Sequence, residues 1–191
     1  MISPKAAGNY LITLYEKTKY QCESRKLQKV SIYAEIIYFL ENQKRLFERG
    51  TVTATSKGLS ISDLSRGPYT LIFNLVNERT EISESFDESS VTQLGIIFGE
   101  NPEFPLDPQI KEVLTYVFKK VGAYSGGDLT EMSKKTLLWQ NARRDKEDSE
   151  SVIITDEMYK NYLNELLKDT KNEVSDRDFI ITEIIKGIVN K

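Results

Sequence analysis

Apolar residues recur at helical spacing along much of the chain. Ser3 followed by Pro4 is a capping residue plus a first-turn proline, and the pattern after it predicts a helix to about Lys19. The segment KLQKVSIYAEIIYFLENQ predicts a second helix over residues 26–43. Its apolar residues cover more than one side, so we expect this helix to pack on several sides.

Residues 46–66 break the helical pattern. Threonine and valine density over 51–55, before a Gly58, Ser60 and Ser62 stretch, favours a short extended piece. Residues 152–154 (VII) predict a second extended anchor. Residues 79–90 are polar and predict a loop, whereas residues 91–98 fit either a buried strand or a short helix.

Further helices are predicted from start signals. Asp107 before Pro108 opens a strongly amphipathic helix that ends at Gly122. The other expected starts are Pro68, Ser125 or Asp128, Lys135, Thr155 and Ser175. The mixed-charge run over residues 143–151 predicts a solvated loop.

These elements predict a mainly α fold: a compact multi-helix single domain with one or two short extended segments. We expect a helical domain over residues 1–170 and a helix over 171–191 appended to it. No internal repeat interrupts this organisation.

Composition places the chain among ordinary globular proteins. It has 191 residues, of which 29% are charged and 39% hydrophobic, and a net charge of -3. This mild charge argues against whole-molecule attraction to nucleic acid. Cys22 is the single cysteine, the N-terminus is polar, and the apolar runs are short, so we expect a cytoplasmic protein without a membrane span.

The chain contains no histidine. Most general-base relays, catalytic zinc sites and Ser or Cys nucleophile systems depend on imidazole, so we expect no enzyme of those classes. Carboxylate, lysine and metal–carboxylate chemistry stay open. The acidic runs lack apolar surroundings, and the glycine-rich stretches fail the P-loop and dinucleotide patterns, so we expect no catalytic residue, metal or cofactor.

Three segments in order carry a resemblance to a known family. They are KLQKVSIYAEIIYFL (26–40), RGPYTLIFNLV (66–76) and VGAYSGGDLTEMSKKTLLWQNAR (121–143). Together they resemble the SocA-like Panacea domain, a family of antitoxin and phage-associated proteins, over roughly residues 5–165. The chain departs from that pattern at 51–66, which is longer and richer in Ser and Thr, and at 132–134, where a Thr-His pair is typical.

The resemblance implies a helical domain that neutralises a partner toxin by direct contact and in some members presents it to an energy-dependent protease. The partner would be a protein encoded by a neighbouring gene. The alternative is a phage or mobile-element protein that binds a host defence or regulatory complex. A DNA-binding regulator is a third class, and the sequence lacks its helix-turn-helix and basic face. The oligomeric state stays open.

Candidate partner contacts come from these segments. They are Lys26, Gln28, Lys29, Tyr33, Arg66, Gly67, Pro68, Tyr69, Trp139 and Arg143. Each also has a structural interpretation. The first three fit the solvated edge of a helix, the Gly-Pro step fits a routine helix start, and a lone tryptophan is more often part of a core than a binding hot spot.

Overall fold

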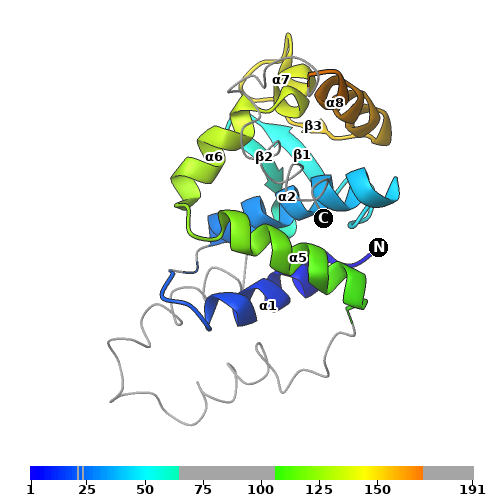
Figure 1. The fold of residues 1–191 in the computed structure, drawn as a ribbon. Coiled ribbons are helices and arrows are strands. Elements are labelled where there is room, and N and C mark those ends of the chain that lie inside the picture. Colours follow the sequence, from blue (N-terminus) through cyan, green and yellow to red (C-terminus); the bar gives the residue numbers. More distant parts are fainter. Residues whose placement is uncertain (21, 23, 65–105, 170–191) are drawn as a thin grey trace.

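The computed structural model describes residues 1–20, 22, 24–64 and 106–169 (Figure 1). The predictions for residues 66–98, including the Gly67–Pro68 helix start, lie outside the described residues. So does the predicted C-terminal helix over 171–191. The described part is mainly helical, with a small antiparallel sheet, which confirms the mainly α class and the presence of short extended segments.

Helix α1 (Pro4–Tyr15) begins as predicted, with the Ser3 hydroxyl accepting a hydrogen bond from the Ala6 amide. It ends at Tyr15, so the prediction that it runs to Lys19 is wrong. The Thr18 hydroxyl donates to the Tyr15 carbonyl and accepts from the Tyr20 amide. A side chain that bonds nearby backbone groups in this way competes with the helical hydrogen bonds.

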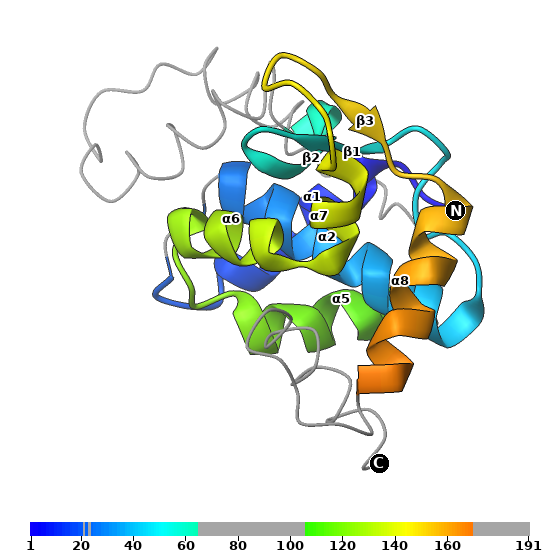
Figure 2. The ribbon, with the colours of Figure 1, turned by 90° about the horizontal axis from the view of Figure 1, so that it is seen from above.

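Helix α2 (Ser24–Asn42) is the central element (Figures 1 and 2). It packs against α1, α5 (Pro108–Val121), α6 (Gly126–Lys135), α8 (Asp156–Asp169) and the sheet. Nearly every residue from 26 to 39 is buried. The expectation that this helix packs on more than one side is confirmed.

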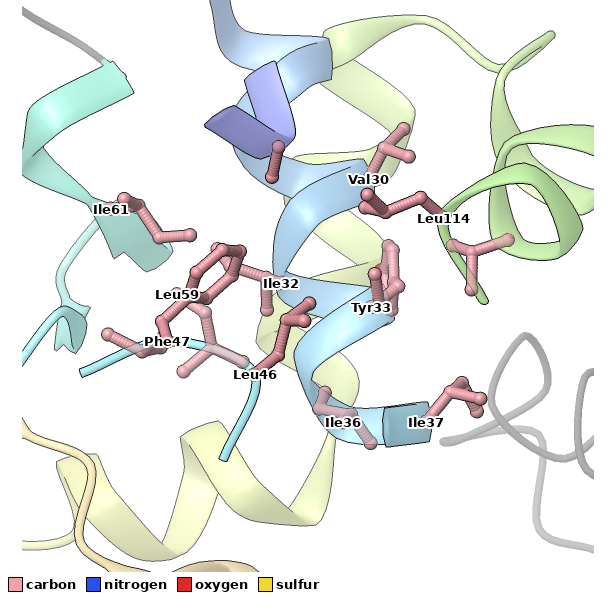
Figure 3. Close-up of a cluster of buried hydrophobic side chains, with 14 of the residues drawn as sticks. Val30, Ile32, Tyr33, Ile36, Ile37, Leu46, Phe47, Leu59, Ile61 and Leu114 are labelled. Atoms are coloured by element: carbon pink, nitrogen blue, oxygen red, sulfur yellow. The ribbon is translucent and has the colours of Figure 1, made fainter. Parts of the chain in front are cut away.

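The packing on the two sides of α2 is visible in Figure 3. Val30 and Tyr33 lie on the side of Leu114 from α5, whereas Ile32 lies on the side of Leu59 from the sheet. All five side chains are at most 1% exposed. Helix α2 therefore supplies apolar packing to both neighbours. Truncating one such buried side chain typically lowers the free energy of unfolding by about 2–5 kcal/mol.

The sheet has the strand order β2-β1-β3, all antiparallel. Strands β1 (Val52–Thr55) and β2 (Gly58–Ile61) form a hairpin with a two-residue turn. A short 3-10 helix, η1 (Ser62–Leu64), follows it. Strand β3 (Val152–Ile153) pairs with β1. Both predicted extended segments are therefore strands, and the Gly58–Ser60 stretch adds the third.

The later helices begin at predicted caps. Asp107 caps α5, and Ser125 with Asp128 forms a capping box on α6. Helix α7 (Leu137–Arg143) starts two residues after the predicted Lys135, because the Thr136 hydroxyl accepts from the Trp139 amide. Within the described residues, no helix combines the length and the apolar character that crossing a membrane requires.

The hairpin approaches α6 and α2 closely at Gly58. This glycine has φ +96, and a Cβ there would lie 2.5 Å from the Ser133 Oγ and 3.1 Å from the Lys29 Nζ. Gly50 has a similar φ of +85 but nothing within 4 Å of its Cβ position. Substitutions at both glycines would therefore strain the backbone, whereas only a substitution at Gly58 would also create a steric clash.

We predict that Gly58→Ala lowers the free energy of unfolding more than Gly50→Ala does. Left-handed backbone should cost each variant about 1–2 kcal/mol, and overpacking should cost Gly58→Ala a further ~1–3 kcal/mol. Urea unfolding of the full chain measures both values. Equal losses for the two variants would show that the hairpin does not approach α6 as described.

Candidate functional site

The polar candidates on α2 are buried. Lys26 and Lys29 are each 4% exposed and Gln28 is 9% exposed. The expectation that they form the solvated edge of the helix is wrong. Helix α2 is covered on several sides, so no edge of it at these positions stays in solvent.

Lys29 joins three elements. Its Nζ donates to the Leu59 carbonyl of β2 and lies 3.3 Å from the Ser133 Oγ of α6. The Ser133 hydroxyl donates in turn to the Thr130 carbonyl at 2.7 Å. Burial, followed by the nearby Arg25 and Lys134 charges, lowers the pKa of Lys29 to about 8.

A lysine with a lowered pKa beside a serine hydroxyl is the composition of a Ser-Lys nucleophile pair. Ser133 is completely buried and Lys29 almost so, which leaves no path for a substrate to the hydroxyl in the described structure. The contacts instead satisfy a buried cation with a carbonyl and a hydroxyl. We therefore assign the pair to the scaffold.

The neighbouring candidates on α2 also make internal contacts. The Lys26 ammonium lies 5.1 Å from the Tyr15 ring centroid and 6.0 Å from that of Tyr20, which are cation–π distances. Gln28 Oε1 accepts a hydrogen bond from Ser60 at 3.2 Å. These contacts tie α2 to the end of α1 and to the hairpin.

Tyr33 and Trp139 make hydrogen bonds to backbone carbonyls. The Tyr33 hydroxyl donates to the Leu129 carbonyl of α6 at 3.4 Å. Trp139 is half-buried, and its Nε1 donates to the Thr55 carbonyl at the end of β1 at 2.8 Å. Gln28, Lys29 and Trp139 thus converge on the hairpin.

Arg143 holds the loop that follows it. Its guanidinium donates to the carbonyls of Glu147 and Glu150 and lies 3.9 Å from the Asp148 carboxylate. Residues 144–151 are exposed, which confirms the predicted solvated loop for them, whereas Arg143, which the prediction included, is 9% exposed and is the last residue of α7. Of the remaining candidates, Arg66, Gly67, Pro68 and Tyr69 lie outside the described residues.

A second polar cluster lies at the other end of α2. Glu35 is completely buried, and its Oε2 accepts hydrogen bonds from the backbone amides of Leu46 at 2.7 Å and Phe47 at 3.0 Å. These amides belong to the segment between α2 and β1. The Glu35 carboxylate therefore fixes where the chain goes after the helix ends.

Arg45 connects this carboxylate to α8. Its Nε donates to Asp156 Oδ1 at 2.6 Å, its Nη2 donates to the Ile154 carbonyl at 2.6 Å, and its Nη1 lies 3.6 Å from Glu35 Oε1. The guanidinium carbon lies 4.7 Å from the centroid of the Tyr159 ring. The planar guanidinium thus donates hydrogen bonds through Nε and Nη2, whereas Nη1 makes only the longer ion pair with Glu35.

The cluster shifts the two carboxyl groups in opposite directions. Burial raises the pKa of Glu35 to about 7, although the two amides and Arg45 oppose that shift. The hydrogen bond from Arg45 holds the pKa of Asp156 below its usual range. Glu35 is therefore the one carboxyl of this cluster that titrates near neutral pH.

A cavity of about 780 Å³ opens beside the cluster, at the C-terminal end of α2. The loop after α2 and the first two turns of α8 supply most of its wall. Its lining residues are Met1, Tyr38, Phe39, Gln43, Lys44, Arg45, Glu48, Arg49, Asp156 and Lys160.

Sequence reasoning did not single out any residue of this cluster or cavity. A signal was present for Glu35, because a carboxylate in a helix that is apolar on several sides has to be buried and paired. No comparable signal marked Asp156, which lies 111 residues from its partner Arg45. Within the described residues, no three Cys, Asp or Glu side chains come together as a metal site would require.

Comparison with known proteins finds no match for this chain among protein-family models, curated proteins or solved structures.

We predict that Glu35 makes folding stability fall between about pH 5 and about pH 7. An unfolded glutamate titrates near 4.5 and the folded Glu35 near 7, so the folded state holds the extra proton in this window. The free energy of unfolding then decreases as pH rises, by at most about 3 kcal/mol. Glu35→Gln keeps an oxygen for the two amides and should lose this dependence.

Urea unfolding at several pH values measures the effect. Glu112→Gln, at an exposed position of α5, is the matched control and should stay parallel to the unmodified chain. Asp156 does not contribute to this pH dependence. Its pKa in the folded chain lies below the usual value of 3.8, so the stability that its charged form provides is lost only below about pH 3.8. Parallel curves for the unmodified chain and Glu35→Gln would refute the assignment.

Proposed function

We propose that this chain is a protein-binding, antitoxin-like domain that neutralises a partner toxin by direct contact in the cytoplasm. The observation that carries the proposal is the contact between two of the three segments that resemble the SocA-like Panacea domain. Residues 26–40 and 121–143 pack together, and the Tyr33 hydroxyl donates a hydrogen bond to the Leu129 carbonyl.

This contact supports the proposal. Tyr33 and Leu129 are separated by 96 residues, yet the buried Tyr33 hydroxyl donates a hydrogen bond to the Leu129 carbonyl. Segments that depend on one another in this way are expected to occur together and in order. We therefore infer that the resembling segments form the internal framework of the domain and not its contact surface.

A scaffold of this kind fits a binding protein with variable partners. The candidate residues on α2, namely Lys26, Gln28, Lys29 and Tyr33, are buried. In such a scaffold the exposed residues are free to differ from one protein to another and to match different toxins. Presentation of the bound toxin to a protease is a further step that such a complex allows. The same scaffold would serve a phage protein directed at a host complex, and the neighbouring genes distinguish the two.

We predict that co-expression with the toxic product of a neighbouring gene restores growth, and that the two proteins co-purify. The measurement is growth with and without this chain, followed by affinity purification and mass spectrometry. An unrelated protein expressed at the same level is the control. The absence of any bound neighbour-encoded protein would rule out the antitoxin assignment.

A further inference from the structure

We propose that the cavity at the C-terminal end of α2 binds an acidic segment of a protein partner. The proposal rests on the proposed function, since it names the chemistry by which a protein partner is recognised. The cavity combines an excess of cationic side chains, a fixed wall and two aromatic rings, and each of these points to the same kind of ligand.

The charge of the lining is opposite to that of the whole chain. Lys44, Arg45, Arg49 and Lys160 are cationic, whereas only Glu48 and Asp156 are acidic. The chain itself carries a net charge of -3. A local excess of positive charge on an acidic protein attracts negatively charged groups to that site.

Two acidic groups near the cavity, Asp156 and Glu35, already face arginines, whereas Glu48 is exposed and offsets one of the lysine charges. Asp156 accepts from Arg45 at 2.6 Å and lies 3.0 Å from Arg49, and Arg45 also faces Glu35. Lys44 and Lys160 are exposed and have no ion pair or hydrogen bond within the described part of the chain. These two ammonium groups are therefore available to a ligand.

The wall of the cavity is held in place before any ligand arrives. Arg45 is pinned by the Ile154 carbonyl and Asp156, and it stacks over the Tyr159 ring. Gln43 closes α2 with a left-handed φ of 54, and its amide donates to the Phe39 carbonyl at 2.9 Å. Because Lys44 follows directly, this turn fixes where its side chain leaves the backbone.

The size of the cavity favours a peptide segment. About 780 Å³ lies in the range of sites that hold a ligand of many atoms, so a single inorganic anion would leave most of the cavity empty. Tyr38 and Phe39 lie in the wall beside the cations. A segment that carries carboxylates and an apolar side chain would use both kinds of surface.

The first experiment titrates the full chain with an oligoglutamate peptide and with an oligoglutamine peptide of the same length, by calorimetry at low salt. We expect the acidic peptide to bind about tenfold or more tightly than the neutral one. The double variant Lys44→Glu with Lys160→Glu should lose this preference. Equal binding of the two peptides to the unmodified chain would overturn the proposal.

The matched control is Lys17→Glu with Lys119→Glu. Both lysines are exposed and lie outside the cavity, and the net charge changes by the same amount. It should retain the preference for oligoglutamate to within about twofold, and an equal loss would show that total charge, not the cavity, controls binding. If inorganic phosphate binds as tightly as the oligoglutamate peptide, the cavity is a site for a small anion, and the proposal is overturned.

The second experiment separates this proposal from the proposed function. Each double variant is co-expressed with the neighbour-encoded protein that the unmodified chain captures. Loss of capture by the Lys44/Lys160 variant alone supports the cavity as the contact, and capture by both variants overturns it while the antitoxin function stands. If the unmodified chain captures no neighbour-encoded protein, the proposed function fails, and the peptide titration still decides the chemistry of the cavity.

Discussion

The burial of charged side chains on a helix that is enclosed on several sides is the constraint on which this structure depends. Helix α2 carries Lys29 and Glu35 into the interior, where an unpaired charge would cost several kcal/mol. Lys29 obtains a carbonyl from the hairpin and a hydroxyl from α6, and Glu35 obtains two amides from the following loop. The position of α2 therefore determines where the hairpin, α6 and the loop can lie.

The same constraint separates the scaffold from the surface. Glu35 fixes the loop after α2, and Arg45 in that loop reaches α8 through Asp156. The cavity wall combines the buried Arg45 and Phe39 with the exposed Lys44 and Lys160. The buried contacts therefore fix part of its shape, whereas exposed side chains supply its unpaired positive charge. Lys44 and Lys160 can vary without disturbing the interior, which suits a protein whose partners differ.

Local signals in the sequence predicted much of the fold. The Asp107–Pro108 start, the Ser125 cap and the threonine-rich strand were visible because each depends on neighbouring residues. The exposure of Lys26, Gln28 and Lys29 was predicted wrongly, because the chain around a helix, and not the helix itself, decides whether its polar positions meet water. The Glu35, Arg45 and Asp156 cluster was missed because its members come from three separate elements that only the fold brings together.

The central claim is that Lys29 belongs to the interior, whereas the cavity lysines Lys44 and Lys160 belong to the surface. Labelling of lysines in the folded chain with an amine-reactive reagent tests this claim most directly. A lowered pKa would make Lys29 the faster nucleophile if solvent could reach it. Mass spectrometry of the labelled, intact-folded chain should nevertheless show rapid modification of Lys44 and Lys160 and slow modification of Lys29. Modification of Lys29 as fast as that of Lys44 and Lys160 would contradict the account.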